Sequence, residues 1–167
     1  MASGDTLVVL LPMGYEPPAT NYATIDTRGA HPVLDFDAST EEAALWTAYL
    51  PKNYAGGGLT VSSFWAFSSD VTGTNTIQVG ADIERMNVSS SALPTEAFGG
   101  VNSATSAGTP TTTGQFIKVD VGFTTGADMD SLAADELFRL RITRIVANAG
   151  DTATGDAELV GIVVKEA

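Results

Sequence analysis

Two carboxylates at strand spacing are the residues of this sequence best arranged for chemistry. Asp35 and Asp37 flank Phe36, and alternate side chains of an extended strand share one face, roughly 6 to 7 Å apart. A pair at that separation suits general acid and base catalysis of glycoside hydrolysis, or the binding of a metal ion. The alternative, which we favour, is that both carboxylates border a strand and face water.

Calcium is the metal that two further pairs of acidic residues would suit. Asp128 with Asp130, and Asp151 with Asp156, stand in predicted loops, and carboxylate oxygens are preferred calcium ligands. Neither pair has the regular acidic spacing, the glycine and the distal glutamate that define an EF-hand loop. We therefore expect no metal site and no cofactor.

The groups needed for nucleophilic catalysis are mostly missing. The sequence has no cysteine and one histidine, His31, which would have to be the base of any serine triad. No serine lies in the Gly-x-Ser-x-Gly pattern of a nucleophile elbow. The run Gly56–Gly58 lacks the Gly-Lys-Ser/Thr ending of a phosphate loop, so we expect a tight turn there. We interpret His31 as a loop residue and expect no catalytic residue and no enzyme activity.

The charge balance excludes two classes of partner. The chain has 20 Asp and Glu residues against 8 Lys and Arg residues, a net charge of −12, which repels nucleic acid and anionic membrane surfaces. No segment approaches the roughly 18 apolar residues of a membrane span. The run Leu7–Leu11 is too short for a signal peptide, and Asp5 stands where positive charge is expected. We expect synthesis in the cytoplasm.

Three of the basic residues fall on one predicted strand. Arg139 and Arg141 share a face of that strand, and Arg144 lies near its end. In a chain with this excess of acid, we expect these arginines to pair with Asp and Glu side chains across a sheet or a subunit boundary rather than to bind phosphate.

Strand-like runs separated by Gly, Ser, Thr, Asn and Asp recur along the chain, as in a sandwich or barrel. Several runs alternate apolar and polar residues, which predicts one buried and one wetted face. We predict little helix, with a helix start in Ser39–Leu45 and one turn in Asp128–Asp135. The fold class is all-β: a single antiparallel β-sandwich domain over 1–167, of the jelly-roll type, with about eight strands. The predicted strands are Thr6–Leu11, Val33–Phe36, Ala43–Leu50, Leu59–Phe67, Thr76–Met86, Gln115–Phe123, Leu137–Val146 and Ala157–Val164.

The first and last predicted strands differ from the others because they are apolar on both faces. Either long loops at 12–32 or 87–114 cover their outer face, or that face meets another subunit, which we favour. The domain also has a proline-rich N-terminal arm (12–20), suited to clasping a neighbour or lying on its own domain, and a long Ser/Thr/Gly-rich loop (87–114). Phe64 interrupts the polar face of its strand, which suits a sugar platform, the core or a subunit contact. The candidate contact residues are Leu7, Val9, Leu11, Pro17, Pro18, Phe64, Val160, Ile162 and Val164.

Most of the chain resembles a group of phage virion proteins. The likeness rests on NYATIDTRGAHPVLDFD at 21–37, YLPKNYAGGGL at 49–59, LAADELFRLRITR at 132–144 and GDAEL at 155–159. The ending also resembles trimeric jelly rolls. The resemblance implies a capsid decoration (cement) protein at the virion surface, a homotrimer whose partner is the major capsid protein or another virion protein. The alternative is a receptor- or glycan-binding head module of a phage fibre or cell-surface protein.

Overall fold

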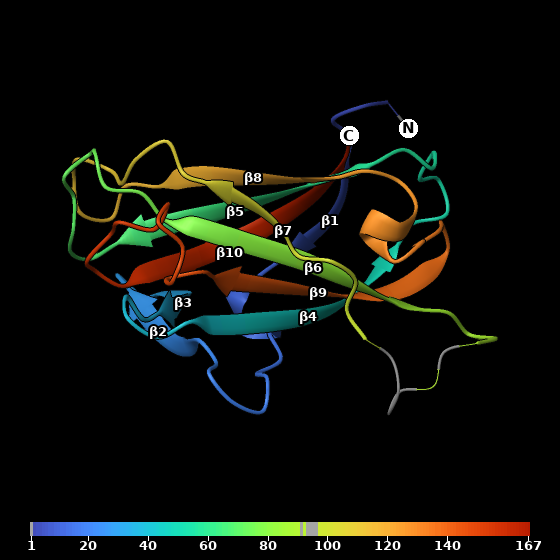
Figure 1. Cartoon of the computed structure of the whole chain (residues 1–167), viewed down its shortest axis with the longest axis horizontal. Helices are drawn as coiled ribbons and strands as arrows, with labels where there is room; N and C mark the ends of the chain where they lie inside the picture. Colours follow the sequence, from blue (N-terminus) through green and yellow to red (C-terminus); the bar gives the residue numbers. More distant parts are fainter. Residues whose placement is uncertain (1, 91, 93–96) are drawn as a thin grey trace.

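Two antiparallel sheets face each other in the computed structural model, which describes residues 2–90, 92 and 97–167. Figure 1 shows the strands as two layers along the long axis of the molecule. The six-stranded sheet has the order β2-β3-β10-β5-β8, with β1 also paired to β10, and the four-stranded sheet has the order β4-β9-β6-β7. The strands are β1 (Thr6–Leu10), β2 (Thr24–Arg28), β3 (His31–Phe36), β4 (Glu42–Leu50), β5 (Leu59–Phe67), β6 (Gln78–Met86), β7 (Asn102–Thr105), β8 (Ile117–Phe123), β9 (Glu136–Arg144) and β10 (Ala157–Glu166).

The core lies between the sheets and is formed by the apolar residues at alternate strand positions. Trp46, Trp65 and Phe138 are among its largest fully buried side chains. Phe36 packs edge-to-face on Trp65, with ring centroids 5.1 Å apart. The all-β sandwich predicted from the alternation is therefore confirmed, and each of the eight predicted runs overlaps a strand.

Two details of the sequence analysis differ from the structure. Strands β2 and β7 were not predicted, because Thr24–Arg28 has one large apolar residue and Asn102–Thr105 has none. The helix start predicted in Ser39–Leu45 is wrong, since a turn leads directly into β4. The turn predicted in Asp128–Asp135 overlaps a short 3-10 helix, η2 (Ala127–Met129). Part of the predicted loop, residues 91 and 93–96, lies outside the described residues. None of the described helices has the length and apolar composition needed to span a bilayer.

The N-terminal arm lies on its own domain. It contains a second 3-10 helix, η1 (Pro12–Gly14), and then runs beside β4. Glu16 and Leu45 exchange two backbone hydrogen bonds of 2.7 and 3.1 Å, and the indole of Trp46 donates to the carbonyl oxygen of Leu11 at 3.0 Å. The arm therefore pairs with the outer edge of the four-stranded sheet, which would otherwise expose unpaired backbone groups.

The Gly56–Gly58 turn has the tight geometry that was predicted. Gly56 has a φ of +90°, which favours glycine. A Cβ atom on Gly58 would lie 2.2 Å from the carbonyl oxygen of Phe123, so only glycine fits this close approach. The hydroxyl of Tyr54 donates to the carbonyl oxygen of Gly57 and holds the turn against the domain.

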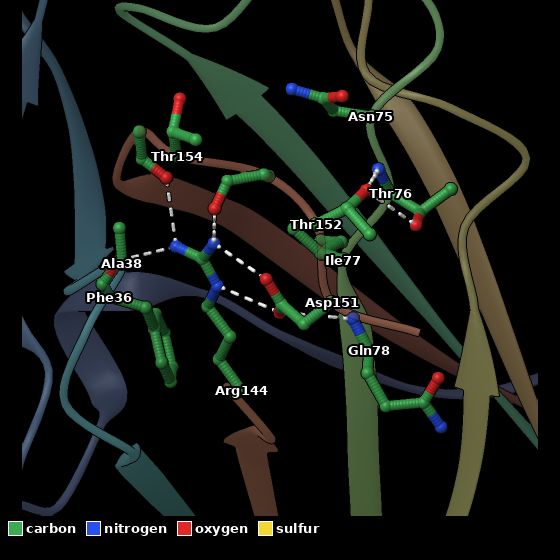
Figure 2. Close-up of polar contacts among 12 residues, drawn as sticks. Phe36, Ala38, Asn75, Thr76, Ile77, Gln78, Arg144, Asp151, Thr152 and Thr154 are labelled. Atoms are coloured by element: carbon green, nitrogen blue, oxygen red, sulfur yellow. Dashed lines mark hydrogen bonds and ion pairs between the residues drawn. The ribbon is translucent and has the colours of Figure 1, made fainter. Parts of the chain in front are cut away.

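A buried arginine joins the loops at one end of the sandwich (Figure 2). Arg144 is fully buried, and its Nε and Nη2 atoms donate to the two carboxylate oxygens of Asp151 at 3.0 and 2.9 Å. Its remaining N–H groups reach backbone carbonyl oxygens, including those of Ala153 and Gly155, both at 2.9 Å, and that of Phe36 at 3.3 Å. The guanidinium group is therefore bonded on all sides, as a buried charge requires.

Asp151 extends this network to a second strand of the four-stranded sheet. It accepts a hydrogen bond from the backbone N–H of Gln78 at 3.1 Å, at the start of β6. The backbone N–H of Ile145 donates to the carbonyl oxygen of Gln78 at 2.8 Å. The ends of β3, β6 and β9 and the loop before β10 thus meet at one ion pair.

We predict that Arg144→Met lowers the free energy of unfolding by about 3–5 kcal/mol, because it leaves Asp151 charged, buried and unpaired. Denaturant unfolding followed by circular dichroism measures this loss. Lys118→Met is the matched control, because Lys118 pairs with Asp120 on the surface and should change stability by less than about 1 kcal/mol. Equal losses in the two variants would contradict the role given to Arg144.

Candidate functional site

The two carboxylates at strand spacing have separate partners in the structure. Asp37 lies just beyond β3, where its Oδ1 accepts hydrogen bonds from the backbone N–H groups of Ser39 and Thr40, both at 2.6 Å, and from the Ser39 hydroxyl at 2.7 Å. These bonds, chiefly from Ser39, lower the pKa of Asp37 to about 2. Asp37 is therefore the cap of a turn and is fully engaged by it.

Asp35 lies on the outer face of the six-stranded sheet, opposite Glu158 on β10. Its Oδ1 is buried and finds no hydrogen-bond partner within the described residues. Burial, followed by the negative charges of Asp156 and Glu158, raises the pKa of Asp35 to about 6. Glu158 itself is completely buried and accepts hydrogen bonds from the guanidinium of Arg28. Asp35 and Asp37 thus do not form the acid–base pair considered from the sequence.

The acidic pairs considered for calcium are bound to protein donors instead. Asp128 accepts hydrogen bonds from Thr124 and Asn102, Asp151 is paired with Arg144, and Asp156 accepts from the backbone of Ala38. Within residues 2–90, 92 and 97–167, no group of three or more acidic or histidine side chains is arranged to hold a metal ion.

A polar groove of about 540 Å³ lies on the outer face of the four-stranded sheet. Its floor comes from the start of β4 and the end of β9. One wall is the end of the N-terminal arm, and the opposite wall is the segment before β7. Donors and acceptors of several kinds surround it, together with the apolar side chains of Pro18, Ala43, Val101 and Ile145. The groove residues are Pro18, Thr20, Asn21, Glu41, Glu42, Ala43, Val101, Arg141, Thr143 and Ile145.

Ion pairs across the sheet hold the arginines beside this groove. Arg141 donates from Nε to Asp82 of β6 at 2.9 Å, and Arg139 lies 3.3 Å from Glu84, in line with the predicted cross-sheet pairing. Burial raises the pKa of Asp82, and Arg141 opposes that effect. Phe98 lies over the Arg141 guanidinium, 4.5 Å from its central carbon to the ring centroid. Arg141 therefore has a defined position at the groove.

The turn capped by Asp37 carries the two groove carboxylates. Glu42 accepts a hydrogen bond from the backbone N–H of Asp37 at 2.9 Å, and burial raises the pKa of Glu42. Glu41, the neighbouring residue, is exposed to solvent. The groove thus combines the amide of Asn21, threonine hydroxyls, an exposed carboxylate and a guanidinium, which are the groups that bind a ligand rich in hydroxyls.

A second, apolar pocket of about 570 Å³ lies on the outer face of the six-stranded sheet. The segment after β1, the residues before β8 and the start of β3 surround it. Leu11, Met13 and Phe116 stand at its rim with 61%, 66% and 62% of their surface exposed. His31 lies here at the start of β3, exposed to solvent. The lining residues are Leu11, Pro12, Met13, Arg28, His31, Pro32, Val33, Ala66, Gly114, Phe116 and Val160.

The structure divides the contact residues chosen from the sequence into three groups. Val9, Leu11, Phe64 and Val160 lie on the outer face of the six-stranded sheet or at its apolar pocket. Leu7 packs partly on the core, whereas Ile162 and Val164 are buried in it and do not reach the outer surface. Pro17 is exposed on the arm, and Pro18 lines the polar groove.

Met13 and Phe116 belong to the apolar pocket but were not chosen from the sequence. The alternation of side chains could have predicted the position of Phe116. Ile117 and Val119 point inward, so Phe116 lies on the opposite, outer face. Met13 follows the end of β1 in a 3-10 turn, where no periodic pattern predicts the direction of a side chain.

Comparison with known proteins identifies a fold but no family. No protein-family model matches the chain, and no curated protein matches it. Among solved structures, it resembles the N-terminal CBM22-1–GH10 modules of Clostridium thermocellum endo-1,4-β-D-xylanase 10B complexed with xylohexaose, with a TM-score of 0.52 and 13% identity over 98% of this chain and 29% of that one. It also resembles the CBM22-1–CBM22-2 tandem domain of Paenibacillus barcinonensis Xyn10C, with a TM-score of 0.50 and 10% identity over 100% of this chain and 47% of that one. This chain spans less than half of either structure, and the similarity shows a shared β-sandwich fold.

We predict that Asp35→Asn stabilises the protein at pH 8 by about 1–2 kcal/mol, a value reduced from the full pKa shift because Asp35 is partly exposed. The folded state keeps the Asp35 proton up to about pH 6, whereas the unfolded chain releases it near its ordinary value. Ionisation of Asp35 therefore destabilises the fold as pH rises from about 4 to about 6. The stability gained by Asp35→Asn should vanish below about pH 4, where the carboxyl group is protonated.

Asp37→Asn is the control, and its effect has the opposite sign. Because the folded state lowers the pKa of Asp37, its ionised form stabilises the fold above the unfolded pKa, and this contribution is lost as pH falls toward 2. Denaturant unfolding at pH 4, 6 and 8 compares the two variants. A stabilising effect of Asp35→Asn that is independent of pH would rule out the burial of a charged Asp35 as its cause.

Proposed function

We propose that this chain is a non-enzymatic binding module whose polar groove holds a neutral oligosaccharide. The observation that carries the proposal is the composition of the groove, where an exposed carboxylate, an amide, hydroxyls and a positioned guanidinium converge on about 540 Å³ of open space. Each sugar hydroxyl both donates and accepts a hydrogen bond, so a site with both kinds of partner suits it.

The charge of the groove supports a neutral rather than an acidic sugar. Glu41 and Glu42 face one cation, Arg141, which is already paired with Asp82. A uronic acid or a sulfated sugar would meet an excess of negative charge, both here and in a chain of net charge −12. The C. thermocellum structure with the same type of fold is a complex with xylohexaose, and xylo-oligosaccharides are therefore the first class to test.

A second candidate is the capsid decoration protein implied by the virion resemblance, located on the capsid surface. The specific observation in its favour is the exposed apolar pocket at Leu11, Met13 and Phe116, because large exposed apolar patches mark contacts with other proteins. Purified protein added to preformed capsids should bind them and raise their resistance to heat. Failure to co-sediment with capsid shells would count against this candidate.

The glycan proposal predicts that a glycan array gives hits among neutral oligosaccharides and that calorimetric titration confirms them. Glu41→Gln should weaken binding at least about tenfold, because a hydrogen bond to a charged group contributes roughly 1.5–3 kcal/mol. Glu41 is exposed to solvent, so the substitution leaves the core intact.

Asp26→Asn is the matched control, because it also removes one exposed carboxylate but lies on β2 of the other sheet. It should leave the affinity unchanged. An array without neutral-sugar hits, or equal binding by the Glu41→Gln variant and the wild type, would refute glycan binding at this groove.

A further inference from the structure

The outer face of the six-stranded sheet carries a cluster of exposed apolar side chains, here called the apolar face. It consists of Val9, Leu11, Met13, Phe116 and the half-buried Val160. These residues come from both ends of the chain and from the segment before β8, and the topology brings them together, because β1 pairs with β10 and β10 pairs with β5, which pairs with β8. The apolar face is therefore a product of the fold and not of one hydrophobic segment.

The size of the apolar face is in the range of protein contacts. Val9 is 58% exposed, and the three side chains at the pocket rim are more exposed still. Together the four present on the order of 400 Å² of surface, about half of what each partner buries in a standard interface. A patch of this size matches the largest apolar patch of a typical monomeric protein, which is often a functional surface.

The charge of the residues around the apolar pocket favours a second copy of this chain as the partner. The chain carries 20 acidic residues, yet among the described residues none of them lines the apolar pocket, whose ionisable side chains are those of Arg28 and His31. The Arg28 charge is already balanced by the buried Glu158. Two copies with net charge −12 repel each other over most of their surface. The lining of the apolar pocket adds no carboxylate of the described residues to that repulsion, because Asp35 and Glu158 of the same sheet lie outside the pocket.

The shape of the apolar face also fits a second copy. It contains both projecting side chains, Met13 and Phe116, and an adjacent pocket of about 570 Å³. In a symmetric contact the same patch supplies projections to its partner and receives the partner's projections. A patch with both features is thus complementary to itself.

From these observations we infer that the apolar face is the surface through which copies of this chain associate. The polar groove lies on the other sheet, so association leaves it open. This inference does not depend on the proposed glycan function, because it rests on different residues on the opposite face of the sandwich.

Sedimentation velocity or light scattering at tens of micromolar tests the inference. The wild type should have a mass at least twice the 17.2 kDa of one chain. Met13→Glu and Phe116→Glu should each weaken association at least about tenfold, because each would bury a charge against an apolar surface. Both side chains are exposed, so circular dichroism should show a folded protein.

Val88→Glu and Phe116→Leu are the matched controls. Val88 is 96% exposed after β6, away from the apolar face, so Val88→Glu should associate like the wild type. Phe116→Leu keeps position 116 apolar and should weaken association far less than Phe116→Glu does. A monomeric wild type, or unchanged association in both the Met13→Glu and Phe116→Glu variants, would overturn the inference. Sugar binding by the dissociated variants, measured separately, reports on the groove alone.

Discussion

The ion pair between Arg144 and Asp151 is the constraint on which one end of this molecule depends. A fully buried guanidinium is stable only if its donors are bonded, and here those donors hold carbonyl groups of the loop before β10 and of the end of β3 (Figure 2). Asp37 follows at that end and caps the turn that carries Glu41 and Glu42. Ile145, next to Arg144, lines the same groove. The interaction that closes the sandwich therefore also positions the floor and one rim of the proposed binding site.

The two outer faces of the sandwich have different chemistry, and this difference supports a division of function. The groove on the four-stranded sheet includes the carboxylates of Glu41 and Glu42, whereas no described acidic residue lines the apolar pocket of the six-stranded sheet, and Asp35 and Glu158 lie elsewhere on that sheet. An assembly formed through the apolar faces would display several polar grooves at once. Linked weak sites bind a repetitive ligand such as a polysaccharide far more tightly than one site does. That combination suits a surface-binding module on a particle or a fibre.

Alternation of side chains predicted most of the fold, because one face of each main strand is buried. The run Leu59–Phe67 has the same bounds in the sequence analysis and in the structure. The pairing of Arg139 and Arg141 with acidic residues also followed from their shared face. Strands β2 and β7 were not predicted because they lie at sheet edges. Few of their side chains are buried there, and their backbone hydrogen bonds to the neighbouring strand determine the extended structure.

The candidate sites were harder to predict, because they depend on contacts between distant loops. Arg144 stands two positions after the inward-facing Ile142, so its burial follows the alternation, but its partner Asp151 lies in a loop with no period. The polar groove joins the arm, β4, β9 and the segment before β7, and nothing in their spacing along the chain indicates that they meet. Asp35 and Asp37 satisfied the spacing rule for a catalytic pair, yet local hydrogen bonds and burial gave them different environments.

Hydrogen–deuterium exchange by mass spectrometry, at high and low protein concentration and with and without a bound oligosaccharide, tests the division of faces most directly. The account predicts that the sugar slows exchange around 18–21, 41–43 and 98–101, whereas higher protein concentration slows exchange around 9–13, 114–117 and 160–163. The two protected sets should not overlap. Protection of the same segments by sugar and by concentration, or protection confined to other parts of the chain, would contradict the assignment of recognition and association to opposite sheets.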